Sequence, residues 1–571
     1  MCVVSLREPG MKAFPSRPGR LANRYRIASP MARLKTACLL AATLVLMASP
    51  AARAQTGDLA ARLPADTLLY LYWRGAESIK PGSKNALVSL WDDPGFRPMR
   101  QWLVQSLVDA TARNPQLSQV SRKDIEALLA DPFIFGIRLA AGTGSATAVP
   151  RANGFLVVQT EGKTGQELSA DLERRLKSAV NVRFTQSGFL LASGDLATLH
   201  ELARQFGSSG QAASKSLSTL ASYQEAHAEI AGRPPLDFFM RVPETSSLAP
   251  QEAAGFDTKA FLQSLHLDRI HLLCGWVDLN QPSNFMHFAI LGDPVTGSLF
   301  DLFGANVSSF QTLAAAPVGG SIVASHLDLG AVVSLFTEAF SAGLGPDRAM
   351  RLKVISALLT STVMPALGGE YAMIRPRLTV GNNPSLLALT VNSPAAEALF
   401  STTLAPFLQP AGQEGEIRYF RLARKPAVAA QGGAEDKPSA GQSMLVALTP
   451  RLLLISTNHE LLRRTARAVT TASPPPGLAG TARFRAARAE LPAELFELIY
   501  FDLHAFDWKE WIEQKAAQMA RNHTNPLAAQ RTAELDRWST EGGAVLARHI
   551  HVIAAGAWKD ERGVHWIGSI Q

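Results

Sequence analysis

The pattern of apolar and polar residues is similar in two 19-residue stretches that lie far apart in the chain. Residues 188–206 (GFLLASGDLATLHELARQF) align without a gap with residues 451–469 (RLLLISTNHELLRRTARAV). Each stretch begins with a continuous apolar run, typical of a buried strand, and continues with the three- and four-residue spacing of a helix packed on a sheet. Asp195 and Asn458 occupy the same aligned position, between the strand-like run and the helix-like run of each stretch. We therefore expect each side chain to cap the helix that follows it.

Other segments keep the same order. A proline stands just before an apolar, strand-like run four times, at Pro64, Pro234, Pro317 and Pro492. The intervals are long, short and long, which is the rhythm of two copies of a two-part unit. Each copy also ends with two apolar runs around a polar turn, which is typical of a β-hairpin. This shared order predicts an internal duplication; the alternative is that generic α+β segments align by chance.

These features divide the chain into four parts. They are a leader and signal peptide (1–54), a first half (55–304), a linker (305–315) and a second half (316–571). Short polar turns between neighbouring apolar runs imply hairpins, and therefore antiparallel pairing. The pattern predicts an internally duplicated α+β fold with helices packed on antiparallel sheets. Residues 424–442 are rich in Ala, Gly, Pro and charge, so we expect a mobile loop there.

Residues 31–54 show the three-part pattern of a secretory signal peptide. A basic start is followed by an apolar run at residues 37–48 and by an Ala-Arg-Ala cleavage site that ends at Ala54. The apolar run is too short to span a bilayer comfortably, and no later run approaches the required length. We therefore expect a periplasmic or extracellular product without a transmembrane anchor after cleavage. The polar character of residues 1–30 favours Met31 over Met1 as the true start.

The formal net charge of +8 suggests a nucleic-acid partner, but this charge resides in the leader. Residues 1–54 carry nine Lys or Arg and one acidic residue, which leaves 47 basic and 47 acidic residues in residues 55–571. The exported chain is therefore formally neutral, and we expect no nucleic-acid partner. Cys274 is the single cysteine after residue 54 and cannot form an intrachain disulfide, so we interpret it as a small buried hydrophobe.

The motifs of known catalytic sites are incomplete or absent in this sequence. Two His-Glu-Leu stretches, at His200 and His459, suggest a zinc protease, but both have arginine where a second histidine is needed. The glycines of residues 142–144 are followed by a proline and a strand rather than by the helix that a phosphate site requires. No nucleophile elbow, P-loop or metal-spaced cysteine pair is present. We assign no catalytic, cofactor-binding or metal-ligating residues.

Strand histidines offered a second possible zinc site. His549 and His551 alternate along one predicted strand, and His565 lies on the next. Folding this hairpin about its polar turn separates His565 from His551 by several positions, and His271 and His287 separate in the same way in the first half. We therefore interpret these histidines as residues on a solvent-exposed strand face.

Residues 91–102 (WDDPGFRPMRQW) hold the densest mixture of aromatic, acidic and basic residues in the chain. Our candidate partner-binding patch consists of Trp91, Asp92, Arg97 and Arg100. The alternative is a structural role, in which Asp93 caps a helix, Pro94 occupies its first turn and Phe96 faces the core.

The run LPADTLLYLYWRG from Leu63 and the helix NALVSLWDDPGFRPMRQWL from Asn85 resemble exported bacterial proteins of the domain-of-unknown-function family DUF3352. The run LPAELFELIYFDL from Leu491 resembles the same strand. The resemblance implies an exported, internally repeated α+β protein of no assigned activity. Our leading hypothesis is a non-enzymatic envelope protein that binds or scaffolds another envelope protein. The alternatives are a periplasmic small-molecule or lipid binder using the groove between the halves, and a hydrolase with a non-standard site.

Overall fold

The computed structural model describes residues 58–571 with several gaps. Outside the description are residues 1–57, 113–120, 141–150, 161, 177–179, 208–215, 231, 233, 243–251, 254–255, 284, 294–297, 381–383, 423–443, 472–476 and 523–525. The predicted signal peptide and the predicted loop at 424–442 therefore lie outside the described residues. Within them, none of the helices combines the length and apolarity needed to span a bilayer.

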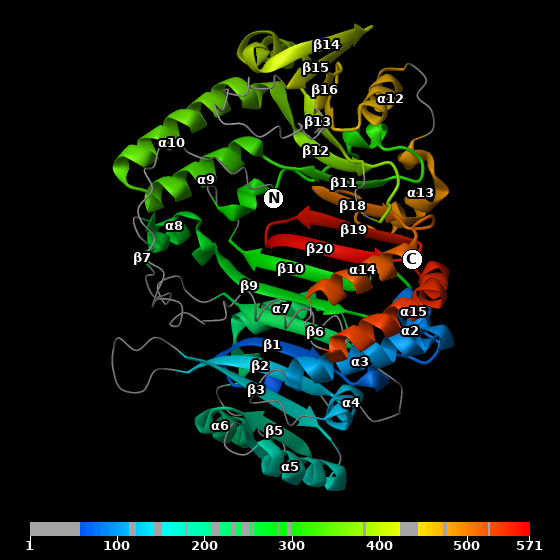
Figure 1. The fold of residues 1–571 in the computed structure, drawn as a ribbon. Coiled ribbons are helices and arrows are strands. Elements are labelled where there is room, and N and C mark those ends of the chain that lie inside the picture. The colour runs from blue at the N-terminus through cyan, green and yellow to red at the C-terminus, as the bar shows by residue number, and fades with distance from the viewer. Residues whose placement is uncertain are drawn as a thin grey trace, which may run out of the picture. The chain divides into compact units, whose positions relative to one another are not determined.

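A large antiparallel sheet of 18 strands organises the described chain (Figure 1), which confirms the α+β class and the antiparallel pairing. Its strands are β1 (Thr67–Trp73), β2 (Phe133–Ala140), β3 (Arg151–Gln159), β4 (Asn181–Phe184), β5 (Phe189–Ser193), β6 (Leu236–Arg241), β9 (Ile270–Val277), β10 (Met286–Gly292), β11 (Ser321–His326), β12 (Leu367–Arg375), β13 (Leu386–Val391), β14 (Leu408–Glu414), β15 (Ile417–Leu422), β16 (Leu445–Leu448), β17 (Leu452–Ser456), β18 (Glu497–Asp502), β19 (Val552–Lys559) and β20 (Gly563–Ile570). A separate small ribbon pairs β7 (Glu252–Ala253) with β8 (Phe256–Asp257). All four runs that follow the marked prolines form strands, namely β1, β6, β11 and β18.

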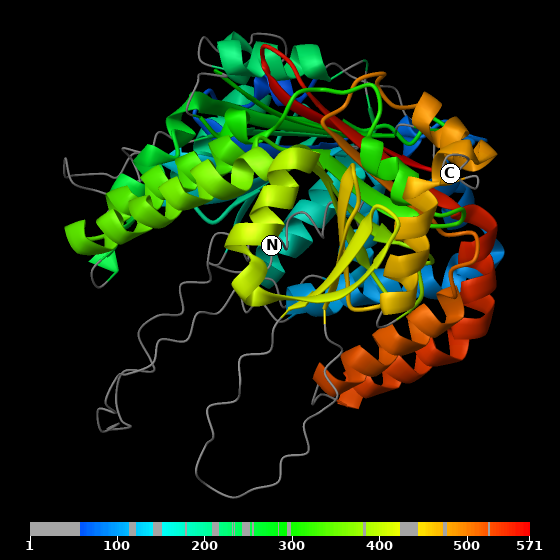
Figure 2. The same ribbon diagram turned by 90° about the horizontal axis from the view of Figure 1, so that it is seen from above.

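The helices fall between the strands and, in several cases, pack in pairs. They are α2 (Ala86–Asp92), α3 (Arg97–Ala112), α4 (Arg122–Ala130), α5 (Gly162–Leu176), α6 (Leu196–Gly207), α7 (Ala221–Glu229), α8 (Thr258–Ser264), α9 (Leu329–Gly343), α10 (Pro346–Leu358), α11 (Ser393–Ala398), α12 (His459–Thr470), α13 (Ala482–Ala489), α14 (Trp508–Asn522) and α15 (Pro526–His549). Helices α14 and α15 run along each other (Figure 2), and α15 also contacts α2 and α3.

Strand pairing gives the spatial order of the sheet. In the first half the order is β4, β5, β3, β2, β1, β6, β9 and β10. The sheet continues through β20, β19, β18, β11, β12, β13, β17, β16, β15 and β14 of the second half. Strands β10 and β20 join the halves by antiparallel pairing from Met286↔Gly568 to Leu291↔Gly563. The final hairpin strands of the two halves therefore meet edge to edge.

Each half has its own apolar core. The first core packs Leu199 and Leu202 of α6 against strand residues such as Phe239 and Cys274. The second core packs Leu461 and Leu462 of α12 against the strands of its own half. Cys274 is fully buried, which confirms its interpretation as a small hydrophobe. The burial of such side chains supplies the main driving force for folding of each half.

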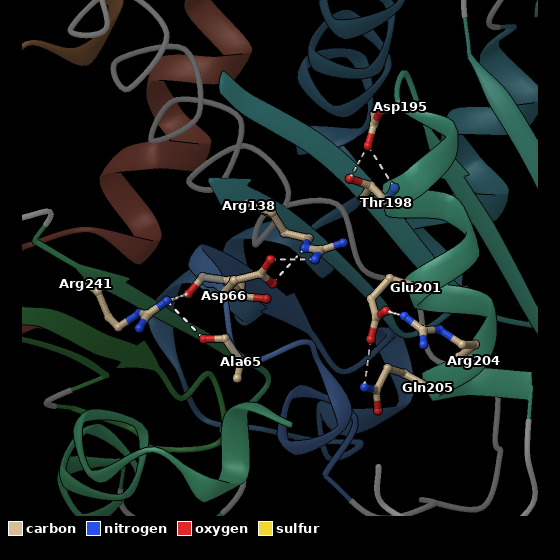
Figure 3. A network of polar contacts seen from close by, with 10 residues as sticks. Ala65, Asp66, Arg138, Asp195, Thr198, Glu201, Arg204, Gln205 and Arg241 are labelled. Carbon is tan, nitrogen blue, oxygen red and sulfur yellow. Dashed lines mark hydrogen bonds and ion pairs between the residues drawn. The ribbon is translucent and has the colours of Figure 1, made fainter. Parts of the chain in front are cut away.

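The two predicted helix caps are present. The backbone N–H of Thr198 donates to the Asp195 carboxylate at 2.8 Å (Figure 3), and the N–H of Leu461 donates to the Asn458 side chain at 2.9 Å. Each contact satisfies an otherwise unpaired donor at a helix start. The strand before each cap, β5 or β17, has the predicted position. Local geometry in these two stretches is therefore alike.

The Leu-Pro-Ala-Asp turn before β1 is held by residues distant in the sequence. Arg241 donates to the Ala65 carbonyl oxygen at 3.0 Å, and Arg138 pairs with the Asp66 carboxylate at 2.8 Å (Figure 3). Arg241 ends β6 and Arg138 lies on β2, the two strands that flank β1. The turn therefore fastens the start of β1 to both of its neighbours.

Candidate metal centre at the junction of the two halves

The predicted partner-binding patch lies on α2 and the beginning of α3. Trp91 is buried at 7 % exposure, and the Arg100 guanidinium lies over its ring at 5.5 Å from the ring centroid. Asp92 and Arg97 are exposed. Trp91 and Asp92 also line a small pocket of about 40 Å³ with Leu87 and Leu279. The structure thus brings Trp91 and Arg100 into contact with each other and leaves Asp92 and Arg97 at the surface.

The residues between these four dock the segment onto α15. Asp93 accepts a hydrogen bond from Gly95 N at 2.8 Å and lies within 2.9 Å of Arg548 and His549 side-chain nitrogens. These contacts hold the pKa of the Asp93 carboxyl well below its usual range, the Arg548 and His549 hydrogen bonds being the largest causes. Trp538 donates to the Gly95 carbonyl at 2.9 Å. The structural role expected for Asp93 is therefore present, together with a contact to the far end of the chain.

A different cluster lies where the halves meet. His287 of β10 and His565 of β20 have ring centroids 5.7 Å apart and ring planes within 16° of parallel. Their residues are only 6 % and 2 % exposed. The interpretation as exposed strand histidines is therefore wrong for these two, because α7 ends on their face of the sheet and the rings of Trp276 and Trp558 lie beside them. His271 of β9 does lie exposed, as expected, whereas His549 is the last residue of α15 and not part of the predicted strand.

Glu229, the last residue of α7, completes the cluster. Each of Glu229, His287 and His565 offers one potential ligand atom, and the three atoms lie within 4.8 Å of one another. His565 Nδ1 lies 3.5 Å from Glu229 Oε2, which is too long for a well-formed hydrogen bond. The Glu229 carboxylate also contacts the Arg562 guanidinium. Two imidazoles and a carboxylate are thus gathered from three elements that are distant in the sequence.

Two tryptophans flank the histidines. In the strand register, His287 is opposite Trp276 of β9, and His565 is opposite Trp558 of β19. The Trp558 and His565 rings are stacked with centroids 5.0 Å apart. Trp276 donates its indole N–H to the Glu229 carbonyl at 3.2 Å, which fixes the end of α7 against the sheet. These rings shield the imidazoles from water.

Burial favours neutral imidazoles in this cluster. It lowers the pKa of His287 to about 4, with a further contribution from His565. It also lowers the pKa of His565, although the neighbouring Asp560 acts in the opposite direction. The Nδ1 atoms of both histidines are buried and have no hydrogen-bond partner. A buried polar atom without a partner is costly, so a ligand that engages these nitrogens would relieve that cost.

Asp560 orients one of the imidazoles. Its carboxylate lies 3.2 Å from His565 Nε2 and accepts hydrogen bonds from the backbone N–H groups of Arg562 and Gly563 at 2.9 and 3.1 Å. The β19–β20 turn therefore holds the carboxylate in place. A carboxylate on one imidazole nitrogen leaves the other nitrogen to face a metal, which is the arrangement common around metal-bound histidine. Here the free nitrogen, Nδ1, is the one near Glu229.

The donor set suits a divalent transition-metal ion. Two imidazole nitrogens and one carboxylate oxygen are typical ligands of Zn²⁺ and of neighbouring first-row ions. Metal–ligand distances of about 2.0–2.2 Å require ligand atoms about 3.4 Å apart. His565 Nδ1 and Glu229 Oε2 are already 3.5 Å apart, so binding would close the remaining separations, now at most 4.8 Å, by no more than about 1.4 Å and would displace Arg562 from Glu229. Side-chain rotation alone provides movements of this size.

Sequence reasoning missed this cluster, although part of its signal was present. His287 and His565 lie in the two hairpins that the sequence pattern predicts to correspond, and that pattern compares each hairpin only with its own half. The structure instead pairs them with each other, because β10 and β20 share an edge. Glu229 lies in a helix with no motif around it, so no local pattern pointed to it.

The chain was compared with protein-family models, with curated proteins and with solved structures, and none of the three comparisons gave a match.

Proposed function

We propose that the protein is an exported, non-enzymatic binding protein of the cell envelope that holds a divalent transition-metal ion where its two repeated halves meet. The observation that carries this proposal is the buried pair His287 and His565, which have unpartnered Nδ1 atoms and each offer a ligand atom within 4.8 Å of the Glu229 carboxylate. The alternative hypothesis of a small-molecule binder also places its site between the two halves.

The strand order supports an internal repeat. Reading away from the β10–β20 junction, the first half runs β10, β9, β6, β1, β2, β3, β5, β4, and the second runs β20, β19, β18, β11, β12, β13, β17, β16. The second half then adds the hairpin of β14 and β15. At the junction, Phe288 is opposite Trp566, and His287 and His565 lie one residue to either side of that pair. Two copies of one unit, facing each other across this pair, would produce such an arrangement.

Burial favours a binding role over turnover. His287 and His565 have almost no exposed surface, so a bulky substrate has little access to an ion held between them. Two hollows in the described part of the chain lie elsewhere, at Trp91 and along α10. Catalytic metal sites keep an open coordination position facing a cleft. A buried ion is better suited to hold elements together.

The site would link the halves. Glu229 and His287 belong to the first half and His565 to the second, so an ion bound by all three bridges β10, β20 and α7. An ion that binds the folded state alone raises the free energy of unfolding in proportion to the logarithm of its concentration above Kd. The expected role is therefore a metal-dependent clamp at the junction, and a partner protein could sense whether it is closed.

The test is metal binding by residues 55–571. Isothermal titration with Zn²⁺ should show one site per chain, and Co²⁺ should give the visible absorption of a low-coordinate nitrogen and oxygen site. His287→Ala and His565→Ala should each weaken binding by more than the roughly 10–100-fold typical of losing an outer-shell partner. His271→Ala is the matched control, since it removes an exposed imidazole from the neighbouring strand β9. Unchanged affinity in both junction variants would exclude the site, and hydrolysis that depends on bound metal would favour an enzyme.

A further inference from the structure

Among the described helices, α10 exposes the most bulky apolar side chains. None of its residues is buried. Four large apolar side chains are mostly in solvent: Met350 at 70 %, Val354 at 64 %, Ile355 at 56 % and Leu358 at 60 % exposure. Contiguous exposed apolar surface of this kind is rare on soluble proteins and marks a contact site.

The spacing arranges these residues on one side of the helix. Met350, Val354 and Leu358 are each four residues apart, so they form a continuous stripe. Ala349, Leu352 and Ser356, which are half-buried, lie on the opposite side. The helix packs against α9, its main neighbour, and Figure 1 shows the two helices side by side. The exposed fractions of its side chains show that the stripe faces solvent.

Basic residues flank the stripe. Arg348, Arg351 and Lys353 are exposed on this helix, and Asp347 is its one acidic residue. In a helical projection Arg351 falls on one side of the stripe and Lys353 on the other. Pro346 at the first helical turn provides a rigid start. The helix thus presents an apolar stripe between two positive margins.

We infer that this α10 face docks in the plane of an anionic lipid surface, with Met350, Val354 and Leu358 inserted among the headgroups. Helices with an apolar stripe between Lys or Arg residues bind such surfaces in two ways. The stripe is buried among the headgroups, and the basic side chains are attracted to the anionic lipids. The inference is independent of the proposed metal site, which shares no residue with α10.

Other occupants fit the face less well. A second copy of the chain, placed face to face, would bring the same three basic residues together, and like charges oppose such a contact. Protein interfaces are anchored mainly by Trp, Tyr and Arg in pockets, whereas the stripe consists of Met, Val, Ile and Leu. A fluid lipid surface requires no shape complementarity, and its negative charge matches the margins.

The experiment is vesicle flotation of residues 55–571 with two vesicle types. Vesicles of equal parts phosphatidylcholine and phosphatidylglycerol should carry the protein to the top of the gradient, and vesicles of phosphatidylcholine alone should carry much less. Added salt should weaken binding, because it screens the margins. Val354→Glu should reduce the partition coefficient at least about tenfold, because it places a charge in the apolar stripe. The double variant Arg351→Glu with Lys353→Glu should reduce the partition coefficient roughly fivefold for each positive charge that it removes.

Val318→Glu is the matched control, because Val318 is a valine with 56 % exposure outside this helix. All the substituted side chains are exposed, so circular dichroism should show unchanged folding in every variant. Absence of flotation with the anionic vesicles would overturn the inference, as would equal losses in the Val318 and Val354 variants. Sedimentation that shows a dimer abolished by Val354→Glu, without vesicle binding, would assign the face to a second copy instead.

Discussion

At the residue scale, helix capping was partly predictable because it depends on neighbours within four residues. Asp195 and Asn458 cap α6 and α12 as predicted. Asp93 also accepts the expected local hydrogen bond, from Gly95. What no local pattern revealed is its second role, since Arg548 and His549 reach it from the end of α15. One carboxylate therefore serves a nearby turn and a distant helix.

Asp93→Asn should lower the free energy of unfolding by about 1 kcal/mol, because asparagine still caps but loses the charge that Arg548 and His549 contact. The folded-state pKa of Asp93 is depressed, so its contribution is present above the unfolded value of about 3.9 and is lost as pH falls below it. The difference in Tm between wild type and variant should be full near neutral pH and shrink in acid. Asp92→Asn, at the exposed neighbour, is the control; an equal effect of pH on both variants would contradict the assignment.

At the scale of elements, the β-hairpins were predictable and the edge that joins them was not. The alternation and polar turns indicated β9–β10 and β19–β20 correctly, because a hairpin is formed by consecutive residues. The choice of β20 as the next neighbour of β10 depends on two sheet edges that are distant in sequence. That choice brings His287 and His565 together on one face of the sheet, and it thereby creates the candidate metal centre.

Gly563→Ala should weaken the junction without changing a ligand. Gly563 has φ +153°, and an added Cβ would lie 2.1 Å from the Ile290 carbonyl oxygen across the β10–β20 pair. We expect a loss of about 1–3 kcal/mol in the free energy of unfolding and weaker Zn²⁺ binding, measured by denaturant titration and calorimetry. Gly154→Ala on β3 is the control, since nothing lies within 4 Å of its added Cβ. Normal stability of the Gly563 variant would exclude a tight junction at this point.

At the scale of the whole described chain, the largest core of each half lies on one shared sheet, and a smaller cluster of Phe300, Phe496, Ala557 and Val564 spans the junction. The first core and the second core have no residue in common, and the β10–β20 pair connects the strands around them. Residues of the predicted linker contribute to the second core: Phe310 and Ala315 are buried there. We therefore expect local unfolding in one half to leave the hydrogen bonds of the other half largely intact.

Leu199→Ala and Leu462→Ala test this division, because the two leucines occupy the same aligned position and are both buried, at 4 % and 0 % exposure. Each substitution should cost about 2–5 kcal/mol in its own half. Hydrogen exchange followed by mass spectrometry should show lost protection in the first half for Leu199→Ala and in the second half for Leu462→Ala. Leu196→Ala, at an exposed leucine of α6, is the control. Equal loss across both halves in either core variant would indicate a single cooperative unit.

The sequence by itself determined the features that depend on neighbouring residues: the strand runs, the hairpins, the two caps and the α+β class. These follow from side-chain periodicity and turn chemistry within short segments. Only the tertiary structure decided that β10 pairs with β20 and that α7 ends beside them. It thereby gathered Glu229, His287 and His565 at one point and left α10 without cover. Such contacts depend on which strand edges and helix faces pack together in space. The periodicity of one segment does not specify which distant segment it will pack against.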